Sequence, residues 1–395
     1  MSKPKVCSIH RVDFAAVAES LPKIEPHVPR SNELIDILIL ARGFEERVVE
    51  VPRRLAQAKA IDSRTFVMCG RYATNQTDND NRFTELVQWL AGTTIIDCDA
   101  DSPSNTEQQI AALLSRCPRS RAHRVVFDIS GSSSTFIFSV MAALRRSSTP
   151  VELEVVYAEA DRYYPDVQAL EGESFELRHN ASFASGRPRE EGAGSAEFHE
   201  SYRGLQVENR PSHIIGVPCL STGRFERCLQ QLGEEDSADP SEALTLILPY
   251  TDADAHNWRE GAIEELARTF TANRTDDATK LPHVERCDTH VYVQILGVIL
   301  RLADTHLGSN VYLVHFGPKL QTIGASLALL AREEIALMFT RPRKFFADRY
   351  SEGVGQVWSL RIGDLRKLVG DLRNVGCLQV RWDEAAPGEY LPTHS

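Results

Sequence analysis

Small hydroxyl residues, glycines and one lysine follow two apolar segments of this chain in a pattern suited to binding phosphate. After the first segment come Ser130, Gly131, Ser132 and Ser133, and after the second come Gly317, Lys319 and Thr322. Glycine lets the backbone approach a ligand closely, while hydroxyls and the amides of a helix N-terminus donate hydrogen bonds to an anion. We predict that these residues bind phosphate, with an ordinary helix N-cap as the alternative role of the serine-rich turn.

Charged motifs also occur twice, in the same order. Gly43 precedes Arg47 as Gly223 precedes Arg227, and the pair Arg162-Tyr163 recurs as Arg349-Tyr350. The offsets between copies are 227 − 47 = 180, 317 − 131 = 186 and 349 − 162 = 187 residues. Matches in one order at a nearly constant offset indicate a duplicated unit. We expect the arginines to neutralise phosphate and the tyrosines to stack on a base, with helix-surface charge as the alternative for Arg47 and Arg227.

A third group of cations lies close to the second tyrosine. It consists of Arg341, Arg343 and Arg349, interleaved with Phe345, Phe346 and Tyr350. Cations among aromatic rings suit a ligand that has both phosphates and bases. The alternatives are a solvated surface of an acidic protein and a contact with a partner chain.

Carboxylates supply the residues for a different, enzymatic function. Asp128 ends an apolar segment, and Glu45 and Glu46 follow Gly43. A carboxylate with raised proton affinity in a closing cleft can act as a general acid or base, so these three are the catalytic candidates. The twelve histidines and eight cysteines show no metal-binding spacing. Walker, nucleophile-elbow and dinucleotide fingerprints are absent too, and we expect no metal and no cofactor.

Alternating strands and helices must position these residues. Runs rich in Val, Ile and Phe predict strands at 35–40, 64–70, 94–98, 124–129 and 151–157, and again at 213–219, 244–250, 311–316, 335–339, 356–362 and 377–382. Helical spacing fills most intervals, for example at 134–147 and 319–332. The predicted fold is α/β, with two tandem Rossmann-like, doubly wound and mostly parallel sheets related by internal duplication. Ligands of such sheets bind at the carboxyl ends of the strands.

The same pattern divides the chain into five regions. We predict an N-terminal extension at 1–32, a first Rossmann-like domain at 33–170, a linker or loop insertion at 171–210, a second Rossmann-like domain at 211–382 and a flexible tail at 383–395. The linker prediction rests on residues 182–195, which are rich in Gly, Ser, Arg and Glu and lack apolar periodicity.

The composition excludes several classes of protein. The chain has 395 residues, of which 42% are hydrophobic, enough for two cores. No apolar run approaches the ~20 residues that span a bilayer, and residues 1–32 lack the pattern of a signal peptide. Scattered cysteines fit a reducing compartment, so we expect a cytoplasmic protein. A net charge of −11 argues against direct binding to DNA.

Two stretches resemble a known family. Asp128-Ile-Ser-Gly131 resembles the strand and Thr-Gly-Gly turn of CARF domains, with serines in place of the Thr and the second Gly. The segments 311–324 and 335–342 resemble the last strand–turn–helix–strand of SAVED domains, the fused two-copy relatives of CARF domains in bacterial antiviral signalling. The resemblance covers residues 33–362 in outline. It implies cyclic-oligonucleotide binding by Ser130, Gly131, Ser132, Gly317, Lys319 and Thr322.

The resemblance and the motifs predict a nucleotide-binding sensor or regulatory subunit in bacterial antiphage defence. Its ligand would be a nucleotide or another phosphorylated small molecule, and it would act on a separate effector chain or through its own assembly, since no effector segment is recognisable in the sequence. One alternative is a nucleotide-processing enzyme, a phosphodiesterase or glycosidase-like hydrolase, that uses the carboxylates in the same cleft. The other is a ligand-free scaffold subunit of a defence complex.

Overall fold

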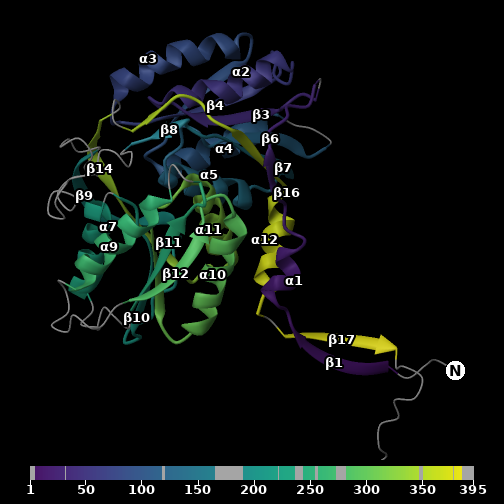
Figure 1. Cartoon of the computed structure of the whole chain (residues 1–395). Coiled ribbons are helices and arrows are strands. Elements are labelled where there is room, and N and C mark those ends of the chain that lie inside the picture. Colours follow the sequence, from purple (N-terminus) through teal and green to yellow (C-terminus); the bar gives the residue numbers. More distant parts are fainter. Residues whose placement is uncertain are drawn as a thin grey trace, which may run out of the picture.

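The chain forms two largely parallel sheets (Figure 1), and the five parallel strands of each lie in the same order. The computed structural model describes residues 5–31, 33–117, 121–164, 190–220, 222–235, 243–253, 257–272, 282–346, 350–376 and 378–384. In each half, five parallel strands lie in the order third, second, first, fourth, fifth along the chain. This is the doubly wound arrangement that the sequence predicts, and its repetition matches the duplicated motifs.

The first sheet is built around five parallel strands. Four of them are β3 (Ile37–Ala41), β4 (Phe66–Arg71), β6 (His123–Asp128) and β7 (Val151–Ala158), and the fifth, β5 (Thr94–Asp99), is a largely exposed edge strand. Every residue of β3 is buried, as expected for a strand covered on both faces. The outer face carries α2 (Glu50–Gln57) and α3 (Gln76–Val87), and the inner face carries α4 (Pro103–Arg116) and α5 (Ser134–Arg146).

The second sheet repeats this plan. Its parallel strands are β10 (Ser212–Val217), β11 (Leu244–Tyr250), β12 (His283–Asp288), β13 (Asn310–His315) and β14 (Ala336–Phe345). Its helices are α7 (Thr222–Glu235), α9 (Trp258–Ala272), α10 (Tyr292–Thr305) and α11 (Lys319–Ala331). The sequence did not predict β12, because this half-exposed strand has only Val284 and Cys287 as apolar residues.

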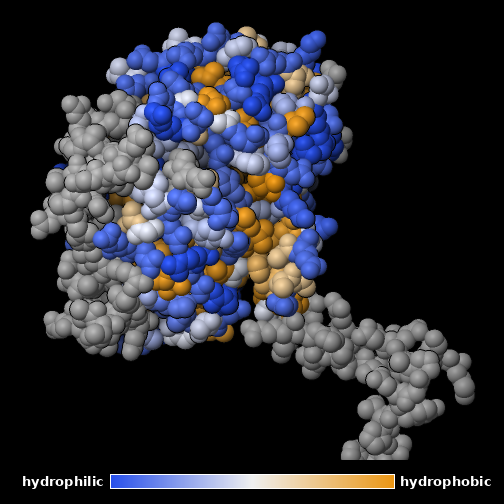
Figure 2. Space-filling model, viewed as in Figure 1, coloured by the Kyte–Doolittle hydropathy of each residue, from blue (hydrophilic) through white to orange (hydrophobic). Residues whose placement is uncertain are grey.

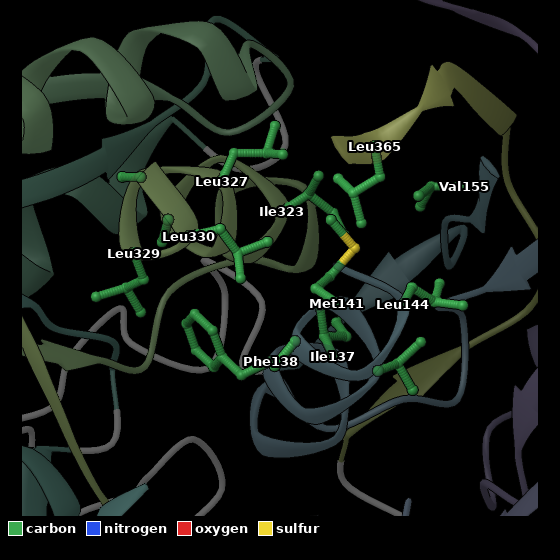
Figure 3. Close-up of a cluster of buried hydrophobic side chains, with 14 of the residues drawn as sticks. Ile137, Phe138, Met141, Leu144, Val155, Ile323, Leu327, Leu329, Leu330 and Leu365 are labelled. Carbon is green, nitrogen blue, oxygen red and sulfur yellow. The ribbon is translucent and has the colours of Figure 1, made fainter. Parts of the chain in front are cut away.

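The two halves share one hydrophobic core through α5 and α11. Figure 3 shows Ile137, Phe138 and Met141 of α5 near Ile323 and Leu330 of α11. All residues of α11 from Leu320 to Ala331 are buried. A helix that is apolar on every side must lie inside the protein, and here it lies between the two sheets. Burial of α5 and α11 therefore fixes how the halves face each other.

Strands cross between the predicted regions, which corrects the predicted boundaries. Residues Glu190–Arg203 form β9, antiparallel to β14, within the segment predicted as a linker. This strand lies at the sheet edge and has few apolar residues, so it shows no strand pattern in the sequence. β16 (Val357–Asp364) pairs with β7, so a strand of the predicted second domain belongs to the first sheet. β2 (Ile24–Pro26), from the predicted extension, pairs with β16.

Two short ribbons complete the fold. β8 (Arg162–Tyr163) pairs with β15 (Ser351–Glu352), and this ribbon continues the pairing of β7 with β16. β1 (Lys5–Arg11) pairs with β17 (Leu378–Glu384), where the predicted tail begins. This second ribbon lies beyond α1 (Phe14–Ala18) and α12 (Leu365–Arg373), away from both sheets (Figure 1).

The surface is mainly hydrophilic in the view of Figure 2, with apolar residues gathered over α1 and α12. In the part of the chain that the structure describes, none of the helices has the length and apolar character needed to cross a bilayer.

Candidate functional site

The N-termini of α5 and α11 meet where the two halves face each other. Ser134 Oγ lies 3.4 Å from Thr322 Oγ1, and Lys319 Nζ donates to the carbonyl oxygen of Ser132 at 2.6 Å. Both helices follow the fourth parallel strand of their half, so the two loops are equivalent. Ligands of open α/β sheets bind beyond the carboxyl ends of the strands. The meeting of these loops therefore defines the candidate site, the rim cluster, which comprises Glu45, Arg47, Asp128, Ser130, Ser132, Ser134, Lys319 and Thr322.

The loop between β6 and α5 is held by its own hydrogen bonds. Ser130 N and Oγ both donate to Asp128 Oδ1, at 2.9 and 2.5 Å. Ser132 Oγ donates to the carbonyl oxygen of Asp128 at 3.3 Å. Ser133 Oγ accepts from Phe136 N at 3.1 Å and so caps α5. The N-cap alternative therefore describes Ser133, while the hydroxyls of Ser130 and Ser132 are engaged within the loop.

Gly131 and Gly43 let two loops of the first half pack together. A Cβ at Gly131 would lie 2.7 Å from the carbonyl oxygen of Ala41 and 2.9 Å from Val48 Cγ1. A Cβ at Gly43 would lie 3.1 Å from Gly131 Cα. Gly317 is equally tight, because its Cβ would lie 2.7 Å from a valine side chain of β10. The close approach expected of these glycines is thus made to neighbouring protein atoms.

Arg47 is a buried cation with a carboxylate partner. It lies in a 3-10 turn after β3, and its side chain is 1% exposed. Nη2 donates to both carboxylate oxygens of Glu45, at 2.6 and 2.9 Å. Nη1 donates to the hydroxyls of Tyr157 and Tyr163, at 2.9 Å each. Burial opposes the charge on Arg47, but Glu45 raises its pKa well above the ordinary value, and Arg47 in turn keeps the pKa of buried Glu45 low.

Lys319 and Asp128 add a second cation and a second carboxylate. Burial, and then the charge of Arg47, lowers the pKa of Lys319 to about 8. Burial raises the pKa of Asp128 to about 6, against hydrogen bonds from Ser130 and the charges of Arg47 and Lys319. With Glu45 included, these charges sum to zero when all are ionised. Protonation of Asp128 leaves a net positive cluster, which favours an anion as the pH falls through about 6.

Aromatic rings from both halves lie next to the rim cluster. The ring of Tyr350 lies 5.6 Å from that of Phe44 and 5.9 Å from that of Phe345, edge to face in both cases. Glu46 accepts a hydrogen bond from Gly353 N at 2.9 Å. Tyr350 and Glu46, both predicted site residues, therefore take part in contacts that join the halves.

The predicted arginines outside the cluster contact other segments of the protein. Arg162 Nη1 lies 3.8 Å from Glu352 Oε2 on the β8–β15 ribbon. Arg341 Nη2 donates to the carbonyl oxygen of Asp101, in the other half, at 2.7 Å. Arg343 is exposed on β14. Arg349 lies outside the described residues.

The second-half copies of Gly43 and Arg47 lie in a different setting. Gly223 and Arg227 belong to α7, and a Cβ at Gly223 would meet no atom within 4 Å. The first half forms a 3-10 turn here, and the second half forms one straight helix. Although the two sequence motifs match, Arg227 therefore does not lie in a buried site like that of Arg47.

Four residues that make contacts at or near the candidate site were not predicted from the sequence: Tyr157, Glu159, His290 and Ser351. Ser351 Oγ donates to Glu45 from β15, and His290 Nε2 pairs with Glu159 across the halves. Tyr157 had one available signal, since it lies at the carboxyl end of a predicted strand. The other contacts join residues more than 130 positions apart, so no local pattern indicates them.

The described residues offer anion binding and proton transfer rather than metal binding. Lys319 and Arg47 can bind an anion, and Asp128 can exchange a proton near neutral pH. No group of three or more His, Cys, Asp or Glu among the described residues is arranged to hold a metal ion.

Comparisons with known proteins leave the function to be argued from the site. No family model and no curated protein matches the chain. A Type III CRISPR defence DNA nuclease activated by cyclic oligoadenylate is similar over 74% of this chain, at 7% identity and a TM-score of 0.39, and this chain spans 63% of that nuclease. The cytoplasmic domain of a prokaryotic cation chloride cotransporter matches 80% of this chain and 98% of its own length, at 10% identity and a TM-score of 0.20. A UDP-N-acetylglucosamine 2-epimerase matches 76% of this chain and 87% of its own length, at 11% identity and a TM-score of 0.21. These scores are too low to carry an argument.

Proposed function

We propose that this protein binds a nucleotide or another phosphorylated small molecule at the rim cluster and acts as a sensor. The observation that carries the proposal is the position of Lys319, a partly buried cation of the second half whose Nζ contacts Ser132 of the first half. The N-termini of α5 and α11 meet beside it, and their dipoles favour negative charge.

Electrostatics supports an anionic ligand. Burial lowers the proton affinity of Lys319, which means that the site holds its positive charge at a cost in free energy. An anion beside Nζ would offset that cost, as Glu45 and Asp128 already do in part. A phosphate carries more charge than one carboxylate and has several acceptor oxygens, so it suits Lys319 together with Arg47.

Sensing would follow from the shared position of the site. A ligand that contacts both loops binds one relative placement of the halves more tightly than others, and it shifts the population by its differential affinity. By resemblance to CARF and SAVED domains, the shift would be read in the cytoplasm by a separate effector chain in bacterial antiphage defence, or by further copies of this chain.

One observation favours an enzyme as the second candidate. Burial raises the pKa of Asp128 to about 6, so this carboxyl can take up and release a proton near neutral pH. The reaction would be hydrolysis of a nucleotide held at the same cluster.

The test is calorimetric titration of the purified protein with a panel of mononucleotides and of linear and cyclic oligonucleotides, followed by chromatography of the mixtures. We expect binding by the wild type, a loss of at least about tenfold in K319M, and no loss in K367M, which changes an exposed lysine on α12. Equal affinity of K319M and wild type would reject the assignment, and absence of binding to every nucleotide would reject the function. Turnover that is lost in D128N would identify the enzyme instead.

A further inference from the structure

Glu45 occupies the position that an anionic ligand of Arg47 would take. Both of its carboxylate oxygens accept hydrogen bonds from Arg47 Nη2, and the pair is almost fully buried. Arginine binds carboxylate and phosphate with the same planar set of donors. An internal carboxylate in this place is therefore chemically exchangeable for a phosphate oxygen.

Arg47 also has a donor that Glu45 leaves unused. Its Nε is buried and has no hydrogen-bond partner, although buried N–H groups are nearly always paired. The charge of Lys319 acts on both Arg47 and Glu45, which places a second cation close to the same point. An unpaired buried donor beside a second cation points to a further acceptor at this position.

Glu45 is in turn held by the second half of the chain. Ser351 Oγ, on β15, donates to Glu45 Oε1, and Gly353 N donates to the neighbouring Glu46. The other strand of this ribbon, β8, carries Tyr163, whose hydroxyl accepts from Arg47. The Arg47–Glu45 pair thus contacts both strands of the β8–β15 ribbon, one of which precedes the second sheet in the chain and the other follows it.

We propose that Arg47 is a masked anion subsite for a phosphate group, that Glu45 fills it in the unliganded protein, and that exchange of Glu45 for phosphate detaches the β8–β15 ribbon. This inference rests on the proposed function and adds how ligand occupancy reaches the ribbon, whose strand β15 lies in the segment that connects β14 of the second sheet to β16 of the first. A phosphate group has a charge of about −1.5 to −2 at neutral pH, so it competes favourably with a single carboxylate for Arg47 and Lys319.

Detachment has a defined local consequence. Once Glu45 leaves Arg47, the hydroxyl of Ser351 loses its acceptor, and the ribbon is left with its backbone bonds, such as Tyr164 N to the Tyr350 carbonyl oxygen at 3.2 Å. The ribbon continues the longer β7–β16 pair through Gly355 N to the Glu159 carbonyl oxygen, and its two-residue end, held by few backbone bonds, should open more readily than that pair. Its amides should then exchange faster with solvent, and this measurement needs no identified natural ligand.

The experiment uses pyrophosphate as the probe and S351A as the principal variant. S351A keeps the Arg47–Glu45 pair but removes the bond that holds Glu45 from the second half. We expect S351A to bind pyrophosphate roughly 3- to 10-fold more tightly than the wild type, because less free energy is needed to displace Glu45. S115A, which changes an exposed serine on α4, should bind like the wild type.

Hydrogen exchange provides the second readout. We expect faster exchange at the amides of Gly353 and Tyr164 in ligand-free S351A and in wild type saturated with pyrophosphate. E45Q, if folded by circular dichroism, should bind pyrophosphate at least about tenfold more tightly, since the internal anion has lost its charge.

The outcomes separate this inference from the proposed function. Weaker or unchanged pyrophosphate binding in S351A, or ribbon exchange that stays at the wild-type rate on saturation, would overturn the masked subsite. A failure of pyrophosphate to bind the wild type and both variants would overturn it as well. The proposed function stands or falls separately, on nucleotide binding and its sensitivity to K319M.

Discussion

Asp128 and His315 are the last residues of equivalent strands in the two halves, 315 − 128 = 187 positions apart, and each is 2% exposed. Burial raises the pKa of Asp128 to about 6 and lowers that of His315 to about 3, because loss of water penalises the charged form of either group. At neutral pH one copy of this strand end carries a carboxylate and the other a neutral imidazole. The equivalent strand ends of the two halves therefore differ in charge at neutral pH.

The raised pKa of Asp128 predicts a pH-dependent stability difference. A folded pKa of about 6 against an ordinary 3.8 means that the contribution of Asp128 is fully present below pH 3.8 and lost as the pH rises through about 6. D128N can still accept hydrogen bonds from Ser130 and stays neutral. We expect its free energy of unfolding to exceed that of the wild type by roughly 3 kcal/mol at pH 8 and to approach it below pH 4. Urea unfolding at both pH values is the measurement. A difference that does not change with pH, or the same change in E85Q on the exposed face of α3, would contradict it.

The pair between His290 and Glu159 predicts a second stabilisation that is lost as the pH rises, here for a link between the halves. The carboxylate of Glu159 raises the pKa of His290, so the stabilisation is present below pH 6.5 and lost as the pH rises through the higher folded pKa. Glu159 has a lowered pKa and remains charged across this range, because His290 outweighs the effect of its burial. We expect H290Q to lower Tm by about 1–3 °C at pH 6 and to match the wild type at pH 9. Equal losses at both pH values in differential scanning calorimetry would mean that the charge is irrelevant.

Gly131 and Gly223, which each follow a strand of their half, should respond differently to alanine. In G131A the new Cβ would lie 2.7 Å from a backbone oxygen, which cannot move aside as a flexible side chain can, so we expect a loss of about 1–3 kcal/mol. In G223A the Cβ meets nothing within 4 Å and lies in α7, so the change should be neutral or stabilising by no more than about 1 kcal/mol. Chemical denaturation of both variants checks this. Similar losses would show that the two glycines are equivalent after all.

The Arg47–Glu45 pair should show strong coupling in a double-mutant cycle. R47M leaves a nearly buried Glu45 without its cation, and we expect a loss of about 3–5 kcal/mol. The double variant E45Q/R47M removes both charges, and most of that stability should return, since an uncharged pair needs no compensation. Urea unfolding of the four proteins gives the coupling free energy. Additive losses would contradict a charge-compensated pair.

The pattern of apolar residues in the sequence did not predict two strands that lie at sheet edges. Central strands such as β3 are buried on both faces, so their apolar runs identify them from the sequence. β12 and β9 lie at or next to sheet edges with few apolar residues, and the sequence placed β9 in a linker. The partner of β16 was also hidden, because strand pairing between distant segments leaves no local pattern.

The residues of the candidate site divide in the same way. Ser132 and Lys319 were predicted from turn chemistry at strand ends, and the structure places them in contact across 187 residues. The sequence by itself determined two doubly wound units and the loops that end their strands, because hydrophobic periodicity and turn residues are local properties. Only the tertiary structure decided that Glu45 neutralises Arg47, that Ser351 holds Glu45, and that burial shifts the pKa values of Asp128 and His315 in opposite directions. Buried charges are compensated through short distances, and those distances arise only when the halves pack around α5 and α11.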